Sequence, residues 1–176
     1  NEQINKELYS SYLYLGISSF YEKKGLKGFA NWFKIQAQEE LDHGMLMYQY
    51  LHNNNASVSL EAIAKPDMVL NSLEDGLEVA YTHEQKVTAS INAIYAAAME
   101  SKDFRSMQFL DWFVKEQGEE ETNTSELVSK MELFGSDSKA LYMLDSELGA
   151  RVYTAPSLVL SYIDLIARYR ILFCGD

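Results

Sequence analysis

Apolar residues recur at steps of three and four along most of the chain, which is the period of an α-helix with one buried face. No segment shows the alternation that is typical of a half-buried strand. The pattern predicts long helices over residues 2–24, 27–51, 72–102 and 104–133, and a shorter helix over residues 137–148. The predicted fold class is therefore all-α.

Helix-ending residues divide this pattern. Gly25 ends the first predicted helix, Asp103 can cap the fourth, and Gly135 ends it. Residues 56–72 contain Pro66 and lack clear periodicity, so they predict a connection long enough to travel the length of a bundle. Two helical hairpins joined by a long crossover, with a short fifth helix, form a four-helix bundle.

The length and composition fit one domain with a well-buried core, because the 176 residues are 47% hydrophobic. We divide that domain into a four-helix body over residues 1–135, the short fifth helix over 136–150, and a tail over 151–176. The net charge of -11 would repel nucleic-acid phosphates, so we expect cations rather than nucleic acid as partners.

The chain also carries signals about its compartment. Cys174 is the only cysteine, which excludes a disulfide within the chain and favours a reducing compartment. No run of about 18 apolar residues predicts a membrane span, and the polar residues 1–7 do not resemble a signal peptide. We therefore expect a cytoplasmic protein with no membrane partner.

Each predicted long helix carries carboxylates on a face that is otherwise apolar or aromatic. On the second helix, Glu40 and His43 lie one turn apart on the same face as Phe33 and Met47, so both point inward. The Glu-x-x-His spacing lets a carboxylate and an imidazole reach one metal ion. The corresponding inward acids of the other helices are Glu7, Glu84 and Glu120.

Burying these acids without opposing charge would cost several kcal/mol each, of the order estimated for ion desolvation. No lysine or arginine lies on the stripes near them, whereas two divalent irons would supply charge and accept oxygen and imidazole ligands. A single such glutamate is as well explained by a solvated face; four stripes that converge at mid-bundle favour metal. His52 and His83 fall off the stripes and are expected at the surface.

Several segments resemble one known family. They are Asn-Glu-Gln-Ile-Asn-Lys-Glu-Leu-Tyr-Ser-Ser at 1–11, Ala-Gln-Glu-Glu-Leu-Asp-His at 37–43, Glu-Gln-Gly-Glu-Glu-Glu at 116–121 and Leu-Asp-Ser-Glu-Leu at 144–148. Together they closely resemble bacterial non-haem ferritin over most of the chain. The resemblance implies a ferritin-like bundle with the long crossover between its second and third helices.

The resemblance also implies a set of site residues. The first iron would be held by Glu7, Glu40 and His43, and Glu40 would bridge to a second iron bound by Glu84 and Glu120, with Gln117 beside it. A third, nearby iron would involve Glu39, Glu116 and Glu119 together with Glu120. Tyr14 and Trp112 match aromatic residues beside the family's centre. Leu41 stands where a haem-binding relative would have methionine, so no haem is expected.

The implied function is iron storage with ferroxidase activity. The protein would oxidise Fe(II) with O2 or hydrogen peroxide and deposit Fe(III) mineral inside a homo-oligomeric shell, for which the family implies 24 copies. Two other classes stay open on the residues: a di-iron oxidase or peroxidase without storage, and a purely structural bundle with solvated acids. Assembly size separates the first of these from storage, and metal content tests the second.

The tail from Val152 to Asp176 is amphipathic and has no counterpart in the resemblance. It either packs on the fifth helix, projects into the shell, binds a partner or a surface, or is an appended extension; packing or an appended origin is preferred to a targeting role. Gly44 and Gly118 sit inside predicted helices beside the expected ligands. Each costs about 1 kcal/mol relative to alanine, which would loosen the site or admit iron.

Overall fold

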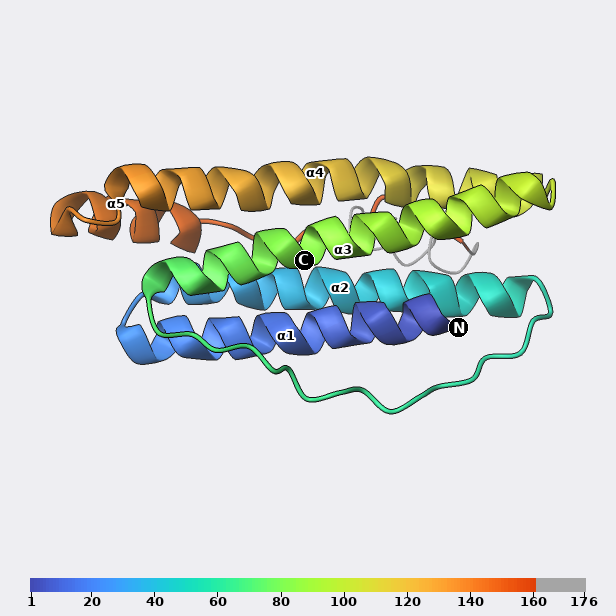
Figure 1. Ribbon diagram of the computed structural model, residues 1–176, viewed down its shortest axis with the longest axis horizontal. Helices are drawn as coiled ribbons and strands as arrows, with labels where there is room; N and C mark the ends of the chain where they lie inside the picture. Colours follow the sequence, from blue (N-terminus) through green and yellow to red (C-terminus); the bar gives the residue numbers. More distant parts are fainter. Residues whose placement is uncertain (161–176) are drawn as a thin grey trace, which may run out of the picture.

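The computed structural model describes residues 1–160, whose regular structure is entirely helical (Figure 1). The helices are α1 (Glu2–Lys24), α2 (Lys27–Asn53), α3 (Leu73–Glu100), α4 (Phe104–Phe134) and α5 (Ser138–Gly149). This confirms the all-α class and the short fifth helix, with helix ends that differ from the predicted ones by at most two residues. None of these helices combines the length and apolar character that a membrane crossing requires.

Local chemistry sets the helix ends. Gly25 closes α1 in the left-handed conformation, with φ of 78°, which glycine adopts without steric cost. Ser72 and Asp75 form a capping box at the start of α3, each side chain accepting from the other residue's backbone N–H. The Asp103 side chain accepts from the Ser106 N–H at the start of α4. The turn at Gly25 and the cap at Asp103 fit the ends for which the sequence predicted them.

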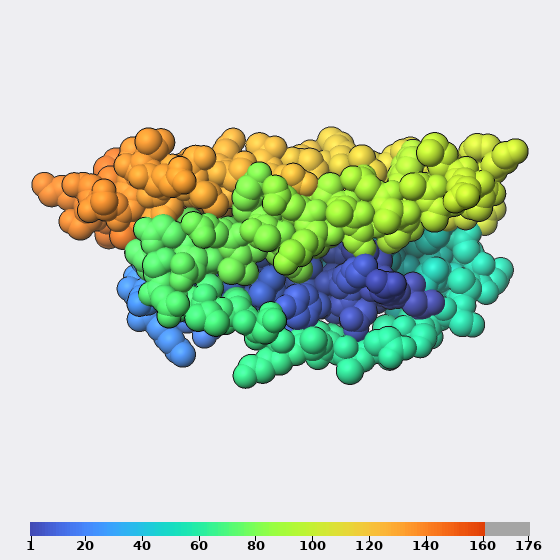
Figure 2. All heavy atoms as spheres, viewed as in Figure 1, coloured from blue at the N-terminus to red at the C-terminus, as the bar shows by residue number. Residues whose placement is uncertain are grey.

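The connection between α2 and α3 runs the length of the bundle beside α1 (Figure 1). Side chains near the start of α1 hold it, since Asn1 Nδ2 donates to the Ser57 carbonyl at 3.1 Å and Asn5 Nδ2 to the Glu61 carbonyl at 3.2 Å. In the space-filling view the connection forms a ridge along one edge, with α1 visible between it and α3 (Figure 2). The crossover therefore returns the chain to the end of the bundle where α2 begins, so that α3 runs parallel to α2 (Figure 1).

Two apolar clusters fill the bundle, one toward each end. The first includes Leu13, Ala37, Ala80 and Leu127, and the second includes Ile4, Met47, Val87 and Phe113. On each long helix the inward acid lies in sequence between a residue of one cluster and a residue of the other: Glu7 on α1, Glu40 on α2, Glu84 on α3 and Glu120 on α4. Because neighbouring helices in each hairpin are antiparallel, the acids meet at mid-bundle.

Helix α5 docks on the start of α2. The Asp145 side chain accepts from the backbone N–H groups of Gly28, at 2.8 Å, and Phe29, at 3.0 Å. The α2 N-cap residue, Leu26, offers no side-chain cap, so α5 satisfies donors that the first turn of α2 leaves open. The backbones approach so closely that a Cβ at Gly28 would lie 1.6 Å from the Asp145 carbonyl oxygen.

The chain beyond α5 runs back along the bundle beside α2 and reaches α4. Asn31 Nδ2 donates to the Arg151 carbonyl, and Tyr153 Oη donates to Asp42 further along α2. Trp112 Nε1 of α4 donates to Ser157 Oγ at 2.8 Å. The first ten tail residues thus lie against the bundle. Residues 161–176, with Cys174 and the remaining tail expectations, lie outside the described residues.

We expect Gly28→Ala to lower the free energy of unfolding by about 1–3 kcal/mol, the usual cost of overpacking, because the added methyl group forces α5 away from α2. Gly118→Ala is the matched control, since a Cβ there meets nothing within 4 Å. It should raise the free energy by about 1 kcal/mol through helix propensity. Denaturant unfolding of metal-free protein measures both, and equal effects of the two substitutions would contradict the close packing described here.

Candidate metal centre

The four inward acids and His43 are almost completely buried. Exposed fractions are 1% for Glu7, 1% for Glu40, 0% for Glu84, 4% for Glu120 and 2% for His43. One comes from each of α1, α3 and α4, and two come from α2. Four carboxyl groups inside a protein core with one imidazole are an arrangement that calls for a cation.

Two groups of side chains converge closely enough to hold metal ions. Glu7, Glu40 and His43 each place a ligand atom within 4.8 Å of the others, and His43, Glu116 and Glu120 do the same. His43 belongs to both groups. Hard carboxylate oxygens with an imidazole nitrogen are a donor set that suits first-row divalent cations such as iron.

Three buried atoms of the first group have no hydrogen-bond partner: Glu7 Oε2, Glu40 Oε2 and His43 Nδ1. Buried polar atoms are nearly always paired, and an ion is one of the standard explanations for an exception. Glu40 Oε2 and His43 Nδ1 lie 3.7 Å apart, so the two atoms face one another across a gap. The unpaired atoms are thus candidate ligand atoms, and they belong to one cluster.

Neutral amides hold the remaining oxygens of these acids. Gln3 Nε2 donates to Glu7 Oε1 at 2.8 Å, and its own Oε1 accepts from Ser90 Oγ at 2.6 Å. Ser90 in turn accepts from Lys6 Nζ at 2.8 Å. A chain of donors therefore runs from a partly exposed ammonium group to Glu7 and fixes which of its two oxygens stays available.

Gln36 plays the same part on α2. It is fully buried, and its Nε2 donates to Glu120 Oε2 at 2.7 Å and to Glu40 Oε1 at 3.3 Å. One amide nitrogen thus joins an acid of α2 to an acid of α4. Glu40 Oε2 is left toward Glu7 and His43.

Glu84 has both oxygens occupied by neutral donors. The hydroxyl of Tyr14 donates to Oε1 through a short hydrogen bond, and Gln117 Nε2 donates to Oε2 at 3.1 Å. Tyr14 is completely buried. Burial and the negative charge of Glu84 raise the pKa of the Tyr14 hydroxyl well above its usual range, so it remains a proton donor to the carboxylate.

Burial also governs the charge of the centre. Loss of solvation raises the pKa of Glu7, Glu40 and Glu120 well above the usual range, and neighbouring carboxylates raise each one further. The pKa of Glu84 is raised too, although its hydrogen bonds from Tyr14 and Gln117 oppose the shift. Burial and mutual repulsion therefore disfavour the charged forms of these acids, and a bound cation would oppose that effect.

The outer acids expected for a third iron take different positions. Glu116 joins His43 and Glu120 in the second group of ligand atoms. Glu39 instead pairs with Arg151, whose Nη2 lies 2.5 Å from Glu39 Oε2, and Glu119 pairs at the surface with Lys115 at 3.0 Å. The structure thus brings one of these three acids to the centre, and the three-iron assignment remains a prediction.

Sequence reasoning missed the residues that support the acids. Arg151 reaches Glu39 and Gln36 from beyond α5, and Gln3 and Ser90 support Glu7. Gln3 stands four residues before Glu7, as Gln36 does before Glu40. That spacing places an amide one turn from the acid on the same helix face, so it was the one available signal.

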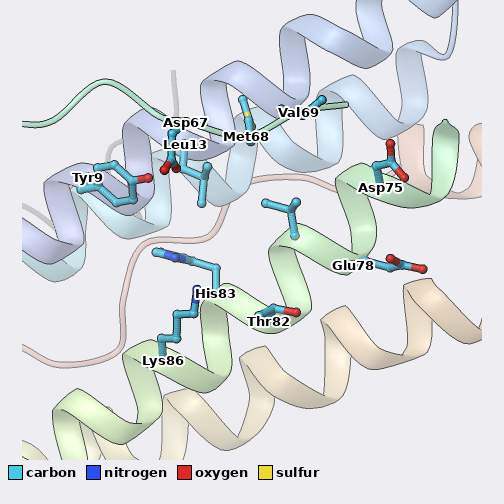
Figure 3. A pocket seen from close by; sticks show the side chains of 11 residues that line it. Tyr9, Leu13, Asp67, Met68, Val69, Asp75, Glu78, Thr82, His83 and Lys86 are labelled. Carbon is cyan, nitrogen blue, oxygen red and sulfur yellow. The ribbon is translucent and has the colours of Figure 1, made fainter. Parts of the chain in front are cut away.

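His83 is placed differently from the expectation of a surface residue. It is partly buried, its Nε2 lies 2.7 Å from Ser10 Oγ, and its side chain extends from α3 toward Tyr9 of α1 (Figure 3). Burial, with Lys86 nearby, lowers the pKa of His83 to about 4. It lines a surface pocket of about 420 Å³ that contains none of the converging ligands. His52 is exposed as expected.

Trp112 lies beside the centre. Its ring meets the His43 ring edge-on, with centroids 5.5 Å apart, and Phe113 approaches the same imidazole at 5.9 Å. These contacts fix the plane of His43. The ring planes, together with the absence of a partner at Nδ1, leave this nitrogen pointing to Glu40.

Comparisons with known proteins agree with this geometry. A family profile described as a Ferritin-like domain matches residues 1–134. A bacterial non-heme ferritin of Campylobacter jejuni is 38% identical over 145 residues, covering 82% of this chain and 87% of its own. A probable bacterial non-heme ferritin-like protein of Haemophilus influenzae is 36% identical over 149 residues, which cover 85% of this chain and 90% of the relative. The open pore ferritin of Archaeoglobus fulgidus superposes with a TM-score of 0.84 at 43% identity, over 86% of this chain and 93% of that one.

The raised carboxyl pKa values give a testable dependence of stability on pH. A buried acid whose pKa is raised on folding destabilises the folded state once pH exceeds its unfolded value, near 4.5 for Glu7. Glu7→Gln replaces the acid by an amide that stays uncharged at every pH, as the protonated acid is. Without metal, the variant should match the native chain near pH 4.5 and become more stable than it as pH rises, by about 1.4 kcal/mol per unit of pKa shift. Denaturant unfolding at a series of pH values measures this; a constant difference would show that Glu7 does not titrate as described.

Proposed function

The chain belongs to the ferritin family, and from that premise we propose that it oxidises Fe(II) at the buried centre with O2 or hydrogen peroxide and stores the Fe(III) as mineral. Iron storage and Fe(II) oxidation are general to ferritins. The proposal for this chain is more specific, since it assigns the reaction to named residues and adds the oxidant and the stored product.

One observation carries the proposal: Glu7 Oε2, Glu40 Oε2 and His43 Nδ1 are buried together without hydrogen-bond partners. Three buried polar atoms without donors in one cluster are an exception that a bound ion explains. Here the available amide donors are spent on the other oxygens. The cluster is therefore arranged for a ligand that accepts three electron pairs at once, which is what a metal ion does.

The proposed residues divide between two irons. Glu7, Glu40 and His43 would hold the first, and Glu40 would bridge to a second held by Glu84 and Glu120, with Gln117 beside it. Glu120 and His43 also meet Glu116, so the second group of ligand atoms offers a further position at the same level of the bundle. Tyr14 would act through its hydrogen bond to Glu84.

The reaction balances with two irons. Each Fe(II) gives up one electron, and O2 takes the two electrons with two protons to become hydrogen peroxide; hydrogen peroxide as oxidant takes two electrons and two protons to become two waters. Carboxylate oxygens stabilise Fe(III) more than Fe(II), which favours the oxidation. Because burial raises the pKa of Glu7 and Glu120, protons displaced from these acids by iron would be a local supply.

Storage requires an enclosed space that one bundle does not provide. We propose a closed homo-oligomeric shell of 24 copies, with the net charge of -11 on each chain attracting iron to it. A di-iron oxidase without storage would use the same centre in a small oligomer. Light scattering after aerobic loading with excess Fe(II) separates the two functions by assembly size and by iron per subunit.

We expect Glu40→Ala to slow Fe(II) oxidation by at least about 100-fold. Losing a residue that only supports a metal ligand already lowers metal affinity or activity by up to about 100-fold, and Glu40 is proposed to bind the metal itself. The helices should stay folded, because the substitution also removes a buried charge. Stopped-flow absorbance of the Fe(III) product measures the rate, and circular dichroism checks the fold. Glu22→Gln, an exposed acid on α1, is the control; oxidation at the native rate in Glu40→Ala would refute the site assignment.

A further inference from the structure

Arg151, two residues beyond α5, places a guanidinium group beside the centre. Nη1 donates to Gln36 Oε1 at 3.0 Å and to the Trp32 carbonyl at 3.2 Å, and Nη2 donates to Glu39 Oε2 at 2.5 Å. The guanidinium lies over the Trp32 ring, 4.4 Å from its centroid. Its planar fork thus serves an amide, a carbonyl and a carboxylate on one helix.

Contacts of the Arg151 backbone and of the preceding helix α5 fix the position of this guanidinium group. The Arg151 carbonyl accepts from Asn31 Nδ2 at 3.0 Å, and α5 is anchored just before it by Asp145 on the first turn of α2. The side chains of Arg151 and Glu39 are only 21% and 18% exposed. The pair is therefore a partly buried ion pair in a fixed geometry, unlike an ordinary surface salt bridge.

Arg151 determines which end of the Gln36 amide faces the acids. By donating to Gln36 Oε1 it leaves Nε2 to donate to Glu120 and Glu40. A flipped amide would set its oxygen against two carboxylates and its nitrogen against a cation. The positive charge also polarises the amide, which strengthens its donation to the acids beyond.

Arg151 also determines where Glu39 points. Glu39 is the residue next to the bridging candidate Glu40, and it lies close enough to His43 and Glu116 to interact with both electrostatically. Yet its carboxylate is absent from both converging groups of ligand atoms, one of which contains His43 and Glu116. The Arg151 guanidinium pairs with the Glu39 carboxylate, in the role that a metal ion would otherwise take.

We propose that Arg151 limits the number of metal ions that the centre holds, by occupying Glu39 and by turning the Gln36 amide toward Glu40 and Glu120. A further ion at His43 and Glu116 then lacks its additional carboxylate and must displace the guanidinium to gain it. The inference rests on the proposed iron chemistry, but it concerns how many ions bind and not whether the centre oxidises them.

A purely structural role for Arg151 makes a different prediction. If the residue only anchors residues 150–160 to α2, its removal loosens that segment and leaves metal binding unchanged or weaker. If it holds Glu39 away from the ions, its removal strengthens the binding of an additional ion. A gain of binding is an outcome that the loss of an anchor does not produce.

The test is an anaerobic calorimetric titration of assembled, metal-free protein with Fe(II), which counts ions per subunit without any turnover. We expect two ions on the native chain, and an additional ion bound about tenfold or more tightly in Arg151→Met than in the native chain, the scale on which outer residues alter metal affinity. Arg151→Gln is a second neutral variant with the same expectation. Arg151→Lys keeps the charge beside Glu39 and should behave as the native chain does.

Two further proteins sharpen the result. Lys130→Gln removes the other ion pair of this region, Lys130 with Glu147 of α5 at 2.8 Å, and should leave the titration unchanged. The double variant Arg151→Met with Glu39→Gln should lose the additional ion. Persistence of that ion in the double variant, or two ions at native affinity in both neutral variants, would overturn the inference alone. A native chain that binds no Fe(II) would overturn the proposed function and the inference with it.

Discussion

The burial of four carboxyl groups at mid-bundle is the constraint on which the rest of this structure depends. Among the described residues no lysine or arginine is buried, so Glu7, Glu40, Glu84 and Glu120 have no cation of their own in the core. Burial of the apolar clusters on either side stabilises the folded state and offsets the free-energy cost of burying these carboxyl groups. Burial raises the pKa of Glu7 and Glu120 well above the usual range, so the neutral form of each acid is favoured where no cation opposes the shift.

Neutral glutamine side chains orient the buried carboxylates without pairing them with a positive charge. The fold is therefore held in place while the carboxylates stay available to bind a cation. Salt bridges to buried cations would have paired the acids permanently. Gln3, Gln36 and Gln117 instead donate neutral hydrogen bonds to carboxylate oxygens, Gln36 to those of both Glu40 and Glu120, and supply no opposing charge. The positive charges stand one step further out. Lys6 acts through Ser90 on Gln3, and Arg151 acts directly on Gln36. One relay thus starts at Lys6 of α1 and passes through Ser90 of α3, and the other starts at Arg151 beyond α5.

The sequence predicted what depends on local periodicity. The helices, the inward faces of Glu40 and His43, and the long crossover follow from three- and four-residue steps and from Gly25 and Pro66. It could not predict contacts that depend on tertiary approach. Arg151 meets Gln36 across 115 positions, and His83 is partly buried against Ser10 and Tyr9 of another helix. The residues next to Glu39 in the sequence do not indicate whether its carboxylate faces a metal ion or an arginine. Only the folded structure distinguishes these two possibilities.

The docking of α5 is connected to the centre by a short rigid path. Asp145 fixes α5 to the α2 backbone, Leu144 and Leu148 join the apolar cluster that contains Phe29, and Arg151 follows after three residues. A shift of α5 would carry the guanidinium away from Gln36 and Glu39 together. The fifth helix is thus part of the support of Gln36 and Glu39 beside the candidate centre. A bundle ending at α4 would keep the four inward acids but lose the contacts of Arg151 with Gln36 and Glu39.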